Sequence, residues 1–221
     1  MKSTSLKFFI LAVTSIAVCW AGKIPTSKNS EELKLRYPFL QVDPLTARAL
    51  LDNDFESGTE EPWYDSSPNT VHWVVEDFSS PAEGYSPPAP LSNGAKYLRA
   101  TRDAQQTAGQ VILRTVTFTA LPGDVISFDF WIRSRYTGAN ALDLVLSVDD
   151  VETTLISLSG YSTSVNLEWR RSFVTILDIT APPTGRDVTL IFYAYCGGNT
   201  DDAIALDNIF LIPASFDGKD E

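Results

Sequence analysis

Apolar and polar residues alternate along much of the chain from about residue 51 onward, which is the pattern of β-strands. In the segment 124–135, one side of the strand would carry Ile126, Phe128, Phe130 and Ile132, and the other Asp129, Trp131 and Arg133. The segments 141–150 and 187–197 repeat this alternation. We therefore expect three long strands, each with one face toward an apolar core.

Shorter segments with the same character separate and flank these three. They cover residues 71–77, 95–102, 110–119, 153–159, 167–177 and 204–212. Turn-forming residues stand between them, at 121–124, 137–140, 182–185 and 197–199. About ten short strands with such punctuation, and no long helical period, predict an all-β fold: a two-sheet antiparallel β-sandwich of jelly-roll type.

The first residues have the features of a secretory signal peptide. Lys2 and Lys7 precede an apolar run that ends at Val18, and Ala21 completes a cleavage site of small residues. The alternative is a single-pass anchor, although the run is short for a span of about 20 residues. We expect residues 1–21 to be removed and the protein to be secreted and extracellular.

Composition divides the rest of the chain into three parts. Residues 22–48 are mixed in charge and lack β alternation, so they are expected to form a non-β N-terminal extension. Residues 49–213 are expected to form the jelly-roll domain, and residues 214–221 an acidic tail. No segment after the signal peptide is long and apolar enough to suggest a membrane span.

The chain is acidic, with 17 Lys and Arg, 28 Asp and Glu, and a formal net charge of −11. This charge argues against nucleic acid and anionic membranes as partners, and it leaves carboxylates available for cations. Of the two cysteines, Cys19 lies in the signal peptide, so Cys196 has no partner within the mature chain. We expect Cys196 to be a small buried residue; an intermolecular disulfide is the alternative.

Carboxylates are placed at both ends of the expected domain. Asp52, Asp54 and Glu56 alternate along the segment 50–58, so in a strand they would share one face while Phe55 faces the core. The first and last strands of a jelly roll are often neighbours, which would bring Asp207 close to Asp54 or Glu56. Such oxygen ligands suit Ca²⁺. The alternative is that these acids are solvated or accept backbone N–H bonds.

Four short motifs resemble those of known β-sandwich families. They are DNDFESG at 52–58 followed by Pro62-Trp63, FDFWIRS at 128–134, Glu168-Trp169, and AIALDNIFL at 203–211. Their order is similar to that in MAM domains and in galactose-binding-like jelly-roll carbohydrate-binding modules. The resemblance implies a structural cation bound by Glu56 and Asp207. MAM domains usually carry paired cysteines, which this chain lacks, whereas the carbohydrate-binding modules need none.

The sequence offers little for catalysis. The only histidine is His72, and no G-x-S-x-G motif is present. The acids at 149–152 lie between two alternating segments, where Asp149-Asp150 is typical of a hairpin turn. We therefore expect a protein that is not an enzyme, with a hydrolase as the alternative.

A ligand-binding surface is expected on an outward sheet face. If the apolar residues of both strands face the core, the outward side chains include Asp129, Trp131, Arg133, Tyr193 and Tyr195. Aromatic rings can stack on the C–H faces of sugars, and the same residue types form protein-binding hot spots. The alternatives are a covering loop or N-terminal arm, or the reverse register, which would place Trp131 inside. Trp169 is expected to be buried.

Together these observations predict a secreted, non-enzymatic module for extracellular recognition or adhesion, with a structural Ca²⁺. Its partner would be an extracellular protein, which could be a second copy of itself. The first alternative is a carbohydrate-binding module that binds glycan on the exposed aromatic face. A lesser alternative is a structural protein of the extracellular matrix.

Overall fold

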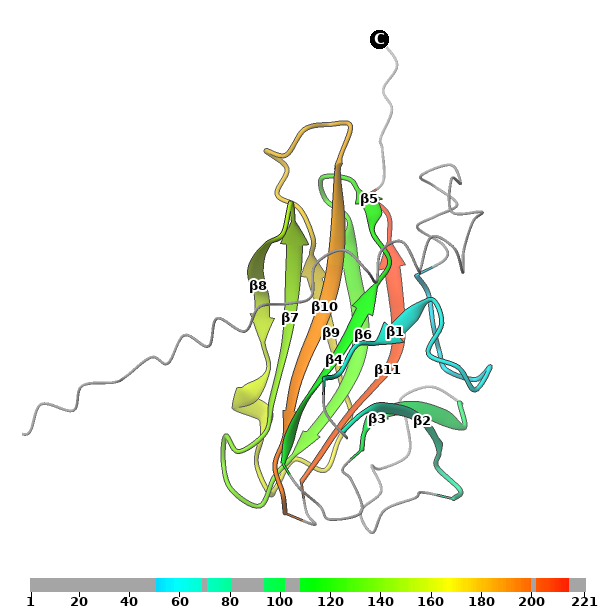
Figure 1. Ribbon diagram of the computed structural model, residues 1–221, viewed down its shortest axis with the longest axis vertical. Helices are drawn as coiled ribbons and strands as arrows, with labels where there is room; N and C mark the ends of the chain where they lie inside the picture. Colours follow the sequence, from blue (N-terminus) through cyan, green and yellow to red (C-terminus); the bar gives the residue numbers. More distant parts are fainter. Residues whose placement is uncertain (1–50, 69–70, 81–93, 102–107, 200–201, 215–221) are drawn as a thin grey trace, which may run out of the picture. The chain divides into compact units, whose positions relative to one another are not determined.

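The computed structural model describes residues 51–68, 71–80, 94–101, 108–199 and 202–214 (Figure 1). Contacts divide the chain into two compact units, 1–38 and 39–221, and every described residue belongs to the second. The predicted signal peptide at 1–21, the extension at 22–48 and most of the tail at 214–221 lie outside the described residues. Within the described part of the chain, no helix has the length and apolar character of a membrane span.

The predicted antiparallel β-sandwich is confirmed: the described residues form eleven strands in two stacked sheets (Figure 1). The six-stranded sheet has the order β1 (Trp63–Asp65), β4 (Gly109–Thr115), β10 (Arg186–Cys196), β7 (Ala141–Val148) and β8 (Val151–Ser157), and β5 (Phe118–Ala120) also pairs with β10. The five-stranded sheet has the order β2 (Trp73–Asp77), β3 (Lys96–Ala100), β11 (Ala203–Ile212), β6 (Val125–Arg133) and β9 (Arg170–Thr175). A 3₁₀ turn, η1 (Ser159–Tyr161), follows β8.

The core lies between the sheets and follows the alternation seen in the sequence. From β6, all four apolar residues of the predicted inner face are buried there, namely Ile126, Phe128, Phe130 and Ile132. The ring of Phe128 meets Phe192 of β10 edge-on, with centroids 4.9 Å apart. Cys196 at the end of β10 is also buried in this core, as predicted. Burial of each large apolar side chain contributes about 1.5–3 kcal/mol to the stability of the sandwich.

The hairpin between β7 and β8 forms at the predicted place. Val148 pairs with Val151, and Asp149 and Asp150 between them have φ angles of 50° and 63°. Two consecutive residues with positive φ are the signature of a type I′ turn, whose twist matches that of the flanking strands. Asp tolerates this conformation better than most residues, because its short side chain can form local hydrogen bonds.

The opening segment differs from the strand expected at 50–58. Only Asn53 pairs with β11, in an isolated bridge to Ile209, and the chain then turns at Phe55, whose φ is 58°. The Asn53 side chain favours this turn, because its Oδ1 accepts a 2.6 Å hydrogen bond from the Phe55 amide. Two expectations are nevertheless confirmed: the opening and closing segments lie side by side, and Phe55 is buried in the core.

Candidate functional site

The five predicted ligand-binding residues do not form one surface. Asp129, Trp131 and Arg133 belong to β6 in the five-stranded sheet, whereas Tyr193 and Tyr195 belong to β10 in the six-stranded sheet. In both strands the predicted register is correct, because the intervening apolar residues line the core. The two groups therefore point away from the core on opposite sides of the sandwich, and only one of them can belong to a given site.

The prediction that Trp131 is available to a ligand is wrong. Its side chain is fully buried although it points away from the main core, because it packs in a second apolar cluster with Tyr97 and Trp169. The indole Nε1 of Trp131 donates a 3.1 Å hydrogen bond to the carbonyl of Asn166. The segment that leads into β9 thus covers this part of the sheet, as the covering-loop alternative anticipated. Trp169 is buried, as predicted.

Asp129 is not an exposed ligand-binding residue either. The Asp129 carboxylate is buried, where it accepts hydrogen bonds of 2.7 and 2.8 Å from Arg171 and one of 3.0 Å from the side-chain Nδ2 of Asn208. These bonds raise the pKa of Arg171 above its usual value. Arg133 is only partly exposed at the end of β6, where its backbone pairs with Ala203. Asp129 therefore serves the structure of this sheet, and the ligand-binding role expected of Arg133 stays a prediction.

The predicted metal-binding acids lie near one another, but two of them have backbone partners. One oxygen of Glu56 accepts 2.8 Å hydrogen bonds from the amides of Ala95 and Lys96. Asp54 is exposed and accepts a 3.2 Å bond from the Glu56 amide. Across the described ranges, no group of three Asp, Glu, His or Cys side chains is arranged to hold a metal ion. Glu56 and Asp54 thus accept the backbone N–H bonds that the alternative anticipated.

Asp207 is different, because one of its oxygens is buried without a partner. Oδ1 accepts a 2.8 Å bond from the Asn208 amide, whereas Oδ2 has no hydrogen-bond partner among the described residues. Burial is the main reason that the pKa of Asp207 is raised to about 7; the backbone amide of Asn208 acts against this rise, and the charges of Asp129, Glu56 and Asp54 add to it. A bound cation would offset the negative charge of a carboxylate buried in this way.

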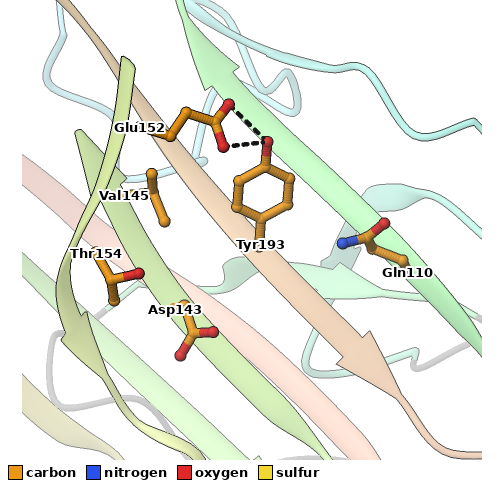
Figure 2. Close-up of a pocket in the computed structure, with 6 residues that line it drawn as sticks. All are labelled: Gln110, Asp143, Val145, Glu152, Thr154 and Tyr193. Atoms are coloured by element: carbon orange, nitrogen blue, oxygen red, sulfur yellow. Dashed lines mark hydrogen bonds between the residues drawn. The ribbon is translucent and has the colours of Figure 1, made fainter. Parts of the chain in front are cut away.

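The outer face of the six-stranded sheet carries an open hollow with a volume of about 380 Å³ (Figure 2). Strands β4, β10, β7 and β8 supply its lining, which consists of Gln110, Asp143, Val145, Glu152, Thr154 and Tyr193. Tyr193 and Asp143 are directly opposite each other on neighbouring strands, and so are Tyr195 and Gln110. Tyr195 is 46% exposed, so its ring is available next to the hollow.

A hydrogen-bond network fixes the tyrosine of the hollow. The hydroxyl of Tyr193 donates to both carboxylate oxygens of Glu152, at 2.9 and 3.1 Å, and accepts a 3.2 Å bond from Arg114 (Figure 2). Burial and the bond to Glu152 raise the pKa of Tyr193 to about 12. The ring is thus held in one orientation before any ligand arrives, which lowers the entropy cost of binding.

Sequence reasoning missed most of the residues that line this hollow: Gln110, Asp143, Val145, Glu152 and Thr154. The signal for two of them was present, because Asp143 and Val145 alternate with the apolar residues of 141–148 and must therefore point outward. Glu152 was considered only as part of a hairpin. The pairing of β7 between β10 and β8, which brings Glu152 to Tyr193, could not be inferred from alternation.

His72 does not form a catalytic triad with its neighbours. Its Nδ1 lies 2.8 Å from Oδ2 of Asp65, and Oδ1 of Asp65 accepts a hydrogen bond from the Ser67 hydroxyl. A triad needs the histidine between the serine and the acid, whereas here the acid lies between the other two. His72 is half exposed and lies just before β2.

Comparison with known proteins finds structures with a similar fold but no matching sequence family. No protein-family model matches it, and no curated protein sequence does. The K3 cleaved adhesin domain of Lys-gingipain from Porphyromonas gingivalis W83 matches 75% of this chain and 99% of its own, with 15% identity and a TM-score of 0.53. The K1 adhesin domain of the same protein matches 75% and 98%, with 12% identity and a TM-score of 0.51.

A structure of the carbohydrate-binding module TmCBM61 in complex with β-1,4-galactotriose is also similar, with 16% identity over 73% of this chain and 94% of its own and a TM-score of 0.48. The two adhesin domains show that the β-sandwich fold is shared. The comparisons do not confirm the likeness to MAM domains.

Proposed function

We propose that this protein is a secreted, non-enzymatic module that binds glycan on the outer face of its six-stranded sheet. The observation that carries this proposal is the hollow beside Tyr193, in which a fixed aromatic ring stands among polar side chains from neighbouring strands. Sugars offer flat C–H faces that pack against aromatic rings, and hydroxyls that need directional hydrogen bonds. Binding sites for small molecules combine these same two elements.

Two further features support this surface over the opposite one. Tyr195 extends the aromatic surface beyond Tyr193 and is half exposed. On the five-stranded sheet, by contrast, the tryptophan of the sequence motif is buried under the segment that precedes β9. The fold is also one that adhesin domains use, which is compatible with recognition.

The test is a glycan array probed with the mature protein, followed by calorimetry with the tightest ligand. We expect at least one class of glycan to bind and Tyr193→Ala to weaken its binding. Phe173→Ala is the matched control, because it also removes an exposed ring, on a strand of the other sheet. No binding to any glycan on the array would exclude the proposal.

Adhesion to protein is the second candidate, and exposed phenylalanines favour it. Phe210 of β11 and Phe173 of β9 both pair with Ser127 of β6, so they flank it in one row, and they are 37% and 63% exposed. The occupant we propose is a second copy of this chain, since a symmetric dimer would bury both rings on each side. Sedimentation of the wild type and of Phe173→Ser tests this: a monomer at all concentrations excludes self-adhesion.

We further propose that Asp207 holds a structural Ca²⁺ together with Asp54 and Glu56. The buried, unpartnered Oδ2 of Asp207 supports this, and so do the neighbouring negative charges that act on it. Thermal melts in Ca²⁺ and in EDTA should differ by several degrees for the wild type, and Asp207→Asn should remove the difference. Identical wild-type melts would rule the site out.

Secretion rests on the N-terminal residues alone. Lys2, Lys7 and the apolar run before Ala21 support a signal peptide. N-terminal sequencing of the protein recovered from the medium of expressing cells should begin at Gly22. Retention of the full chain inside the cell would contradict this proposal.

A further inference from the structure

The lining of the hollow is acidic. It contains two carboxylates, those of Asp143 and Glu152, together with an amide, a hydroxyl, a valine and the tyrosine, and it includes no basic side chain. Arg114 lies beside the hollow, 3.9 Å from the Glu152 carboxylate, and also donates to the Tyr193 hydroxyl. The Glu152 carboxylate is therefore already compensated by protein groups.

Asp143 has no such compensation. Asp143 lines the hollow and is partly exposed, while its Oδ1 is shielded from solvent and has no hydrogen-bond partner among the described residues. Leaving a buried acceptor unsatisfied costs about 1–3 kcal/mol, and more when the group is charged. A ligand in the hollow that offers a donor to the Asp143 carboxylate would offset part of this cost, so Asp143 favours ligands with hydrogen-bond donors.

An anionic ligand would be disfavoured in this hollow. A carboxylate or sulfate placed next to Asp143 cannot donate to it and is repelled by it, and the interaction is stronger at a partly desolvated site than in water. The net charge of −11 on the whole chain adds to this repulsion at low ionic strength. The hollow is thus suited to hydroxyl or ammonium groups and unsuited to acids.

We propose that Asp143 sets the ligand class of this surface: neutral glycans and amino sugars that donate a hydrogen bond to its carboxylate, with uronic-acid and sulfated glycans excluded. This inference rests on the proposed glycan-binding function and adds to it the chemical class of the ligand and the residue that selects it. An ammonium group gains most, because it brings both the donor and the compensating charge.

The test uses oligosaccharides that share one backbone and differ in charge. Tetramers of β-1,4-linked glucose, glucosamine and glucuronic acid provide neutral, cationic and anionic versions, and the array supplies the same comparison for other backbones. For whichever backbone binds, we expect the amino sugar to bind at least as well as the neutral one, and the anionic one to bind at least about tenfold more weakly.

Asp143→Asn tests the role of the residue. It should lower binding of the amino sugar about tenfold and reduce the discrimination against the anionic sugar. Asp150→Asn is the charge-matched control: Asp150 is exposed in the β7–β8 turn, where Asn accepts the same positive φ. The control should leave the preference among the three sugars unchanged.

The possible failures are distinguishable. If the wild type binds no glycan, the proposed function itself fails. If it binds glycans but takes anionic members as well as neutral ones, or if Asp143→Asn behaves like Asp150→Asn, only the assignment of Asp143 is wrong. The comparison of sugars on the wild type stands even if Asp143→Asn does not fold.

Discussion

The hydroxyl of Tyr193 reaches across one strand to hold a carboxylate on the next. Tyr193 lies on β10 and Glu152 on β8, with β7 between them, and the hydroxyl donates to both Glu152 oxygens, at 2.9 and 3.1 Å. This contact ties an edge strand to the centre of the six-stranded sheet. It also positions the aromatic ring over the hollow, so one interaction serves both stability and the proposed site.

The ring and the hydroxyl of Tyr193 can be separated by substitution. Tyr193→Phe removes the bonds to Glu152 and Arg114 but keeps the ring, so we expect a loss of stability of about 1 kcal/mol or less and glycan binding within a few-fold of the wild type. Tyr193→Ala removes both and should weaken binding about tenfold or more. Urea denaturation and calorimetry measure the two effects. Equal losses of glycan binding for Tyr193→Phe and Tyr193→Ala would mean that the hydroxyl, not the ring, contacts the ligand.

The raised pKa of Tyr193 predicts a loss of stability in alkali. Its pKa is about 12 in the folded protein, above the ordinary value of 10.0, because burial and Glu152 disfavour the phenolate. The contribution of this tyrosine to stability is therefore complete below pH 10 and disappears as the pH rises through 12. The difference in unfolding free energy between the wild type and Tyr193→Phe should shrink over this range. A difference that stays constant from pH 9 to 12 would contradict the assignment.

The buried carboxylate of Asp129 makes Arg171 important for stability. Among the described residues, Arg171→Met leaves Asp129, which is 1% exposed, with Asn208 as its remaining side-chain donor. The substitution should destabilise the fold by about 2–3 kcal/mol. The adjacent Arg170 is the control, because it stacks on the ring of Tyr161 at 5.0 Å and Arg170→Met should cost under about 1 kcal/mol. Chemical denaturation compares them. Similar losses of stability for Arg171→Met and Arg170→Met would show that the ion pair between Asp129 and Arg171 contributes little.

Trp131 should matter for stability and not for binding. Trp131→Phe removes the hydrogen bond to Asn166 and leaves a gap beside Trp169, for an expected loss of about 1–3 kcal/mol. Glycan affinity should be unchanged, since Trp131 lies on the sheet opposite the hollow. Calorimetry on the folded variant checks this, and a large loss of affinity would place the binding surface on the wrong sheet.

Much of the fold could be predicted because alternation reports which side of a strand a residue occupies. It placed Ile126 and Phe192 in the core, and the Asp149-Asp150 pair marked a hairpin correctly. Alternation failed to predict the opening segment. There the side chain of Asn53 turns the chain at Phe55, and a single bridge replaces the strand expected at 50–58. Local side-chain hydrogen bonds of this kind compete with strand pairing and leave no periodic trace.

The site was harder to predict, because alternation does not say whether an outward residue is covered or which strands are neighbours. Trp131 points outward as expected, yet Trp169 and the carbonyl of Asn166 cover it. Tyr193 also points outward, and its partner Glu152 is found only once β7 is known to pair with both β10 and β8. Both facts depend on contacts between segments far apart in the chain.

The most direct test of the account is to map the bound glycan on the protein by backbone amide NMR. With the tightest glycan from the array, chemical-shift changes should concentrate on residues 110–114, 141–154 and 191–195, which surround the hollow on the six-stranded sheet. Residues 127–133, 170–175 and 208–212 of the opposite sheet should remain unchanged. Shifts confined to that opposite sheet, or no shifts with any glycan, would contradict the central claim.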